Sequence, residues 1–298
     1  MTLREFFHVH TEAALGFSGG VDSAYLLYAA LEAGARVKAY YVQSPFQPQF
    51  EREDAERLAT ELGADWQILY ADPLQDPQVA RNLPDRCYHC KRMIFGLIEQ
   101  AARQDGFSLL LDGTNASDEE GDRPGIRALR ELSVRSPLRE CGLTKEEIRR
   151  LSRQAGLFTW DKPAYACLAT RIPAGTALTE ALLQKTERAE AALAGLGFRD
   201  FRVRYLDGRA KLQVTAAQMG LALEKRRELL QALQPEYTEV LLDLEERACT
   251  IKKQINFRSG AAGPDVCGRC AAAAEAGALS GPGLCQGGSP PAGPAGSP

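Results

Sequence analysis

The feature that most constrains this chain is a glycine pair between an apolar run and a helical pattern, in AALGFSGGVDSAYLLYAALEAG, residues 13–34. The run AALGF has the length and apolarity of a buried strand, and Gly34 suits the end of the helix after the loop. Glycines let backbone N–H groups approach an anion, and a helix N-terminus adds free donors and the positive end of its dipole. Ser18 and Ser23 add hydroxyl donors. The loop therefore predicts a phosphate site.

This loop differs from the two commonest phosphate-binding patterns. No Gly-Lys-Ser/Thr follows it, so it is not a Walker A loop, and its glycine spacing does not match the dinucleotide pattern G-x-G-x-x-G. A plain strand-to-helix turn is the simplest alternative, because Gly-Gly is common in such turns. Two serines and Asp22 occur together here in a strand–loop–helix context, and this combination favours the phosphate site.

Strand and helix patterns alternate over the first 156 residues. Thr144 and Glu147 have the spacing of a capping box that opens the last of these helices. Such alternation predicts an α/β fold with a parallel, Rossmann-like sheet and helices on both faces. Right-handed crossovers then place the loops that follow the strands along one edge. The predicted strands after the opening motif cover 36–43, 65–71 and 107–115, and the predicted helices cover 50–63, about 87–104 and 145–156.

The pattern changes after about residue 176. A helix is predicted over 178–197, and the strands FRVRYL and RAKLQV flank Asp207-Gly208, a strong hairpin signal. A helix over 216–233 and the strand EVLLDLE follow. Beyond Ser259 the chain is rich in Ala, Gly, Pro and Ser, and it cannot bury enough apolar surface to offset its ordering entropy. The predicted organisation is an α/β domain over 1–176, a smaller α+β domain over 177–258 and a disordered tail over 259–298.

The composition of the chain limits which binding partners and which cellular compartment we expect. The 298 residues are 45% hydrophobic and 25% charged, and the net charge of −3 gives no general attraction to nucleic acid or to an anionic membrane. No apolar run has membrane-spanning length, and the N-terminus does not resemble a signal peptide. We therefore expect a cytoplasmic protein with no membrane partner. In a reducing compartment its eight cysteines are thiols, metal ligands or reactive groups rather than disulfides.

The loop residues match a known nucleotide-binding motif. They resemble the PP-loop of the N-type ATP pyrophosphatase superfamily, whose members have an adenine nucleotide α-hydrolase-like fold. These enzymes split ATP into AMP and pyrophosphate, usually to adenylylate a substrate oxygen. The resemblance implies that the loop holds the β- and γ-phosphates of ATP and that Asp22 assists a Mg²⁺ ion. The ATP-binding residues so implied are Ser18, Gly19, Gly20, Val21, Asp22 and Ser23.

Three further segments narrow the resemblance. They are LPDRCYHCKRMIF at 83–95, DGTNASDEEGDRPGIRALRELSVRSPL at 112–138 and DKPAYACLATRIPAGT at 161–176. Together with the loop they resemble the LarE family of ATP-dependent sacrificial sulfur transferases, which act in the biosynthesis of a nickel-pincer nucleotide cofactor. ACLATRIP is the most specific piece, whereas RCYHCK is shared more loosely with other sulfur-handling members. The resemblance covers roughly residues 10–258.

The resemblance implies a small-molecule nucleotide carboxylate as substrate, a pyridinium-3,5-biscarboxylate mononucleotide. ATP adenylylates the carboxylate, the Cys167 thiolate attacks and releases AMP, and the sulfur then leaves Cys167 as a thiocarboxylate. Adenylylation creates the leaving group that a carboxylate lacks, and a thiolate is a strong nucleophile for the anhydride. Lys162 and Arg171 flank Cys167 and favour its thiolate form. An isolated cysteine would more simply be a small core residue, but the surrounding motif favours a nucleophile.

Cys87 and Cys90 leave a second sulfur source open. Their spacing places both on one face of a helix, and Cys167 is the candidate third thiol. Three thiolates with one open iron match iron–sulfur enzymes whose [4Fe-4S] cluster carries an extra sulfide. The cluster would then supply the sulfur, and Cys167 would be a ligand rather than the donor. Ordinary thiols at a helix start remain the plain alternative, and the Cys267/Cys270 pair in the tail is weak evidence for a metal site.

The predicted hairpin carries a second group of candidates. A two-residue turn sets Arg204 opposite Lys211 and Arg202 opposite Gln213, with the apolar residues on the other face. A solvated polar face is the plain interpretation. The resemblance instead implies that Arg202 and Arg204 bind the substrate phosphate, a task that suits the guanidinium fork. It also places Glu190 near the same subsite.

The remaining predictions concern the loop after residue 111, other functions and assembly. Turn chemistry alone accounts for Asp118, Asp122 and Arg123, but the resemblance places them near the nucleotide or substrate.

A tRNA-thiolating enzyme is the first alternative function, and the acidic balance argues against such a nucleic-acid partner. An amidotransferase-type synthetase would need an ammonia source, and no glutaminase segment is evident. A non-catalytic nucleotide-binding module is a third alternative. We expect a homo-oligomer.

Overall fold

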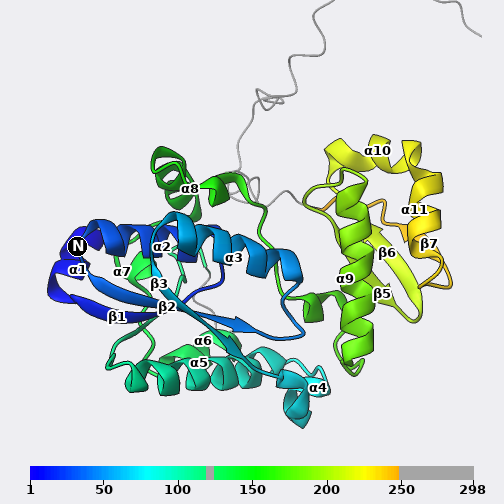
Figure 1. Ribbon diagram of the computed structural model, residues 1–298. Coiled ribbons are helices and arrows are strands. Elements are labelled where there is room, and N and C mark those ends of the chain that lie inside the picture. Colours follow the sequence, from blue (N-terminus) through cyan, green and yellow to red (C-terminus); the bar gives the residue numbers. More distant parts are fainter. Residues whose placement is uncertain (119–123, 248–298) are drawn as a thin grey trace, which may run out of the picture. The chain divides into compact units, whose positions relative to one another are not determined.

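The computed structural model describes residues 1–118 and 124–247, which lie within one compact unit, Met1–Gln254. Two separate sheets form its framework (Figure 1). Several predictions fall outside the described residues: the roles of Asp122 and Arg123, the Cys267/Cys270 pair and the disordered tail. None of the described helices is both long enough and apolar enough to cross a bilayer.

The first sheet has four parallel strands in the order β3-β2-β1-β4. Leu15 of β1 lies beside Ala39 of β2 and Leu111 of β4, so the three strands end at one edge. This arrangement confirms the predicted parallel α/β sheet. The strands are β1 (Glu12–Gly16), β2 (Arg36–Gln43), β3 (Asp65–Tyr70) and β4 (Leu110–Leu111).

Helices cover both faces of this sheet. Successive residues of β1 point to opposite faces: Leu15 packs in a cluster with α2 and α3, whereas Ala14 packs in another with α5 and α6. Figure 1 shows these two helix pairs on opposite sides of the sheet. The helices of this part are α1 (Leu3–Val9), α2 (Val21–Glu32), α3 (Gln49–Glu61), α4 (Pro77–Ala80), α5 (Arg86–Gln104), α6 (Pro124–Glu131), α7 (Pro137–Glu140) and α8 (Lys145–Gln154).

The second sheet contains the predicted hairpin. Its strands β5 (Arg202–Leu206) and β6 (Arg209–Gln213) are antiparallel, and β7 (Val240–Leu242) pairs parallel to β6. Arg204 faces Lys211 and Arg202 faces Gln213, as predicted. Asp207 and Gly208 both have positive φ, at 48° and 83°, the conformation of a two-residue hairpin turn. Helix α9 (Glu180–Gly195) packs its apolar side into the same cluster as the hairpin.

Three predicted elements differ from the structure, and one of them, the strand expected over 239–245, is shortened to β7 (Val240–Leu242). The helix expected over 216–233 is divided at Lys225 into α10 (Met219–Glu224) and α11 (Arg226–Leu233), after a 3₁₀ turn at Ala216–Gln218. Neither α10 nor α11 has a side-chain N-cap, so the sequence carries no sign of the break. The strand expected over 107–115 is reduced to the two residues of β4. On the side away from β1, the described part of the chain pairs with it only through an isolated bridge between Leu111 and Arg135.

Candidate active site

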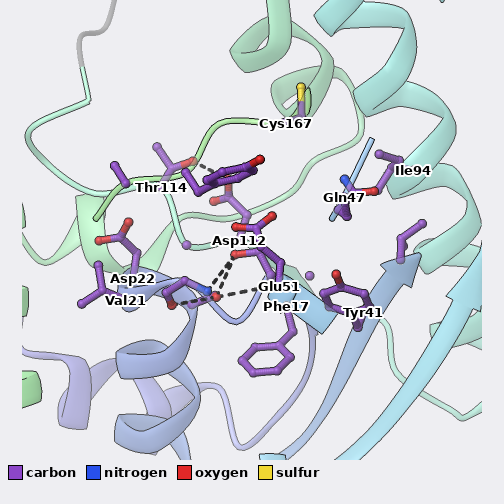
Figure 2. Close-up of a pocket in the computed structure, with 18 of the residues that line it drawn as sticks. Phe17, Val21, Asp22, Tyr41, Gln47, Glu51, Ile94, Asp112, Thr114 and Cys167 are labelled. Atoms are coloured by element: carbon purple, nitrogen blue, oxygen red, sulfur yellow. Dashed lines mark hydrogen bonds between the residues drawn. The ribbon is translucent and has the colours of Figure 1, made fainter. Parts of the chain in front are cut away.

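A cavity of about 420 Å³ lies where β1, β2 and β4 end (Figure 2). Its walls include the Ser-Gly-Gly-Val-Asp-Ser loop after β1, the end of β2 with Glu51 of α3, the Asp112–Thr114 turn after β4, the face of α5 that carries Phe95, and the Lys162–Cys167 segment. Parallel topology explains this convergence, because loops that follow neighbouring strands meet at one edge. The fold thus brings the predicted phosphate loop and Cys167 to one cavity.

The loop after β1 presents free backbone donors to this cavity. Helix α2 begins at Val21 with Gly20 as its N-cap, and no side chain caps its first turn. The first N–H groups of α2 therefore have no intrahelical partner and can bind an anion. The hydroxyls of Ser18 and Ser23 lie 3.1 Å apart, and the Ser23 hydroxyl donates to the Gly20 carbonyl at 3.2 Å. These bonds fix the loop shape without using the donors of the helix.

Two glycines are required here by close packing. Gly19 has φ +68°, and a Cβ at this position would lie 2.9 Å from Ala55 Cα in α3. Gly113 would bring a Cβ within 3.0 Å of the Ser23 backbone nitrogen. Both distances are below ordinary contact, so any side chain would push α3 or the Asp112–Thr114 turn away from the loop.

Asp22 has one carboxylate oxygen paired and one unpaired. Its Oδ2 lies 2.5 Å from Lys145 Nζ, at the start of α8, whereas its Oδ1 is buried without a hydrogen-bond partner in the described structure. Burial raises the pKa of Asp22, and the positive charge of Lys145 opposes this. An unpaired carboxylate oxygen at a cavity wall fits a Mg²⁺ ligand, since Mg²⁺ binds oxygen. Sequence reasoning missed Lys145, although its position directly after the capping residue Thr144 was visible.

The other carboxylates of the cavity differ in their partners. Asp112 accepts from Thr114 and from the Ser136 hydroxyl at 2.6 Å, and Asp118 accepts from the Asn115 backbone. The carboxylate of Glu51 in α3 makes no hydrogen bond or ion pair with the described residues, and Figure 2 shows Glu51 among the labelled lining residues. Burial raises the pKa of Glu51 to about 7, against the opposing charges of Lys162 and Arg171. The sequence did not single out Glu51, because it is one of several acidic residues in an amphipathic helix.

Cys167 is the N-cap of a 3₁₀ turn at Leu168–Arg171 and is partly buried in the cavity wall. Burial raises the pKa of its thiol, and the nearby guanidinium groups of Arg86 and Arg171 oppose this. Both residues expected to favour the thiolate are ion-paired, Arg171 with Glu190 at 2.8 Å and Lys162 with Asp54 at 2.6 Å, so their effect on Cys167 stays a prediction. Arg86 was not anticipated from the sequence.

The cysteine pair lies at the start of α5, as predicted. Cys87 is exposed, and Cys90 is partly buried. Burial and the neighbouring thiols of Cys167 and Cys87 raise the pKa of Cys90 to about 12. Within residues 1–118 and 124–247, however, no three His, Cys, Asp or Glu side chains are arranged to hold a metal ion. The three thiols lie within electrostatic reach of one another, and the cluster itself stays a prediction.

The basic face of the hairpin packs on the segment that carries Cys167. Arg202 is buried and donates to the Ala164 carbonyl at 2.5 Å, and Arg204 donates to the Thr170 carbonyl at 2.9 Å. Burial, together with the positive charge of Arg171, lowers the pKa of Arg202 to about 10. The plain expectation of a solvated basic face is therefore wrong. The two arginines instead support the wall of the cavity from outside.

Glu190 of α9 lies in the same group. Both of its carboxylate oxygens bind Arg171, at 2.8 and 3.0 Å, and it also accepts from the Tyr165 hydroxyl and the Val203 backbone. Neither Glu190 nor the hairpin arginines line the cavity of Figure 2. Their predicted contact with substrate stays a prediction.

The parallel sheet and the Ser-Gly-Gly-Val-Asp-Ser loop at its edge define a PP-loop protein with a Rossmann-like fold. No protein-family model matches the chain. It is 35% identical over 208 residues to the pyridinium-3,5-bisthiocarboxylic acid mononucleotide synthase of Lactiplantibacillus plantarum, a match covering 69% of this chain and 75% of that protein. The chain belongs to this LarE family of sulfur transferases.

Two further relatives match different lengths of the chain. An uncharacterized protein of Synechocystis sp. is 34% identical over 247 residues, which cover 82% of this chain and 92% of the relative. The tRNA-specific 2-thiouridylase MnmA of Thermotoga petrophila is 26% identical over 188 residues, a match that covers 49% of this chain and 52% of that protein. The thiouridylase similarity is weaker, and it connects the chain to the wider group of PP-loop enzymes that transfer sulfur.

Proposed function

We propose that this protein uses ATP to convert a carboxylate of a pyridinium mononucleotide into a thiocarboxylate, in the biosynthesis of a nickel-pincer cofactor. The observation that carries the proposal is that the phosphate loop and Cys167 line one cavity of about 420 Å³. The name of the Lactiplantibacillus plantarum relative supports the substrate class. A single cavity lets one enzyme activate the carboxylate and then attack it before water does.

Activation begins when a substrate carboxylate oxygen attacks the α-phosphorus of ATP and expels pyrophosphate. The free N–H groups at the start of α2, with Ser18 and Ser23, would hold the departing phosphates. Asp22 Oδ1 would bind the Mg²⁺ that neutralises phosphate charge, while Lys145 fixes the other oxygen. The predicted roles of Gly19, Gly20 and Val21 belong to this step.

Transfer follows when the sulfur of Cys167 bonds to the acyl carbon and AMP leaves with the electron pair of the carbon–oxygen bond. In the sacrificial form, loss of the Cα proton of Cys167 then breaks its Cβ–S bond. The electron pair of that bond goes to sulfur, so the product is a thiocarboxylate and residue 167 becomes dehydroalanine. The charges of Arg86 and Arg171 would favour the anionic sulfur of Cys167.

A [4Fe-4S] cluster on Cys87, Cys90 and Cys167 is the other predicted sulfur source. The described side chains do not form a ready set of metal ligands, so we derive no step through a cluster. A single turnover under anaerobic conditions separates the two sources. Sacrifice predicts that residue 167 loses the mass of H₂S in a protein free of iron. A cluster predicts iron, sulfide and an unchanged Cys167.

The proposal is tested by measuring AMP, pyrophosphate and thiocarboxylate from ATP and the biscarboxylate mononucleotide. Cys167→Ala should form AMP but no sulfur product, because the nucleophile is absent while the phosphate loop is intact. Cys141→Ala is the matched control, since Cys141 is a free cysteine outside the cavity. Normal sulfur transfer by Cys167→Ala would refute both forms of the mechanism.

Thiolation of tRNA is a second candidate, favoured by the similarity to thiouridylases. It predicts tRNA binding that weakens with salt, because phosphate contacts release counterions. The net charge of −3 argues against it. A fluorescence-anisotropy titration with unmodified tRNA at two salt concentrations tests this candidate, and salt-sensitive binding with AMP formation would favour it over the small-molecule substrate.

A further inference from the structure

Asn82 lies between α4 and α5 and is buried, with φ +55°. Its Nδ2 lies within hydrogen-bond distance of three carbonyl oxygens after the Cys167 turn, those of Ile172 (3.3 Å), Pro173 (2.8 Å) and Thr176 (3.1 Å). Its own carbonyl accepts from the Gly175 backbone at 2.9 Å. A left-handed backbone is costly for most residues and more readily adopted by Asn. The backbone conformation of Asn82 therefore places its side-chain amide against residues 172–176.

Arg86, at the first position of α5, continues the same network. One of its terminal nitrogens, Nη1, donates to Asn82 Oδ1 at 2.6 Å and to the Ala169 carbonyl at 3.0 Å. The other, Nη2, lies 3.5 Å from Cys87 Sγ. No ion pair links this buried guanidinium to a carboxylate of the described chain. Its acceptors there are an amide oxygen, a carbonyl and a sulfur.

The side chains of Asn82 and Arg86 both hydrogen-bond to the Cys167 turn and the residues after it, from the side of α5. Arg86 binds the turn itself at Ala169, and Asn82 binds the residues that follow it, while the Arg171–Glu190 pair holds the turn from the α9 side. A rigid guanidinium fork can bridge separated acceptors with little further loss of freedom. Leaving the buried carbonyls of Ala169 and Ile172 without donors would be costly. The position of Cys167 relative to α5 thus depends on Asn82 and Arg86.

We propose that Asn82 and Arg86 form a clamp that fixes the Cys167 turn against the start of α5, and that both are positioning residues for sulfur transfer. The catalytic part of this inference rests on the proposed function, whereas the clamp itself does not. Activation of the carboxylate takes place at the phosphate loop, which the clamp does not touch. Loss of the clamp should therefore impair transfer and spare adenylylation.

The test uses Asn82→Gly and Arg86→Met in the full chain. Glycine keeps the left-handed backbone and removes the whole side-chain amide, both the Nδ2 donor and the Oδ1 that accepts from Arg86. Arg86→Lys is the milder variant, because it keeps the charge but cannot bridge both acceptors. Arg92→Met is the matched control, since Arg92 is exposed on the same helix. Hydrogen exchange is followed in peptides that cover residues 166–176, and AMP and thiocarboxylate are measured in single turnovers.

We expect faster exchange over 166–176 in both variants, with Arg92→Met unchanged. Thiocarboxylate formed per AMP should fall about tenfold or more, because small misplacement of a nucleophile is costly, while the rate of AMP formation stays near wild type. Unchanged exchange would overturn the clamp, whatever the activities are. Faster exchange with an unchanged product ratio would overturn the positioning role. If the wild type forms no AMP, the proposed function fails, and exchange still decides the clamp.

Discussion

Asp22 shows how a single side chain divides its two oxygen atoms between the protein and a ligand. Lys145 holds Oδ2, and Oδ1 is buried without a partner among the residues that the structure describes. Asp22→Asn keeps the shape but removes the charge that a Mg²⁺ ion requires, so AMP formation should fall at least about a hundredfold. Titration of Mg²⁺ in a pyrophosphate-release assay measures this. Asp65→Asn is the comparison, because Asp65 is exposed at the start of β3 and does not line the cavity. An Asp22→Asn variant with wild-type Mg²⁺ dependence would exclude the metal role.

Glu51 should make stability depend on pH. Its folded-state pKa is about 7 against an ordinary 4.5, so the native state holds the proton more tightly between these values. The free energy of unfolding therefore falls as pH rises through this window. Glu51→Gln has no carboxyl proton to lose, so its free energy of unfolding should not fall in this window. Between pH 5 and pH 8 the unfolding free energy of the variant should therefore rise relative to that of the wild type by on the order of 2 kcal/mol.

Urea unfolding at the two pH values tests this prediction. Glu56→Gln is the control, since Glu56 is exposed on the same helix. Its effect on the free energy of unfolding should be the same at pH 5 and pH 8. An equal effect of Glu51→Gln at pH 5 and pH 8 would show that burial does not disturb this carboxyl. A stabilised variant with impaired turnover would indicate that the cavity keeps Glu51 for function at the expense of stability.

At this scale the sequence identified residues that belong to a local motif and missed those that act through space. The phosphate loop and Cys167 carry their signal in neighbouring letters, and both line the cavity. Lys145, Glu51 and Arg86 have no such signal. Arg86 affects Cys167 only because the chain folds back over about eighty residues, as the bond from Arg86 to Ala169 shows. One-dimensional patterns do not contain that contact.

Among the elements, the turn at Leu168–Arg171 and helix α9 are joined by a buried ion pair. The side chains of Arg171 and Glu190 are 1% and 5% exposed, and two hydrogen bonds link them. Glu190→Gln leaves a buried guanidinium without its counter-charge, so it should cost about 3–5 kcal/mol of unfolding free energy. Glu61→Gln breaks the exposed pair with Arg57 in α3 and should cost less than about 1 kcal/mol.

Chemical denaturation of the two variants and of Arg171→Met/Glu190→Met checks this comparison. The double variant should be more stable than Glu190→Gln alone, because no charge is left unpaired. Equal losses in Glu190→Gln and Glu61→Gln would mean that burial adds nothing to the pair.

Elements with periodic or turn signals were predictable, and elements defined by tertiary contacts were not. Strand β2 has the predicted bounds, the Thr144–Glu147 capping box opens α8, and the Asp207-Gly208 turn sets the predicted register. The shortness of β4 depends on the strands beside it, and no capping side chain marks the break at Lys225. The hairpin arginines were assigned to one face correctly, but the cavity wall that covers this face is distant in sequence.

For the whole molecule, the question is whether the two sheets are energetically separate. The sequence predicts a boundary near residue 176, between an α/β domain and an α+β domain. The described residues nevertheless belong to one compact unit. Polar contacts join the Cys167 segment to the second part, namely Arg171 with Glu190, Arg202 with Ala164 and Arg204 with Thr170. The boundary at 176 therefore stays a prediction about chain organisation, and independent folding does not follow from it.

We expect residues 1–247 to unfold in one cooperative transition, because separating the two sheets would expose the buried Arg171–Glu190 pair. Trp66 and Trp160 both precede residue 176, so tryptophan fluorescence reports the first sheet, whereas far-UV circular dichroism also reports α9 to α11. The two signals should have the same urea midpoint in the wild type. In Glu190→Gln the circular dichroism should begin to change at lower urea than the fluorescence. Distinct midpoints in the wild type would show that the sheets are independent, and the cavity wall would then not rely on the hairpin for its stability.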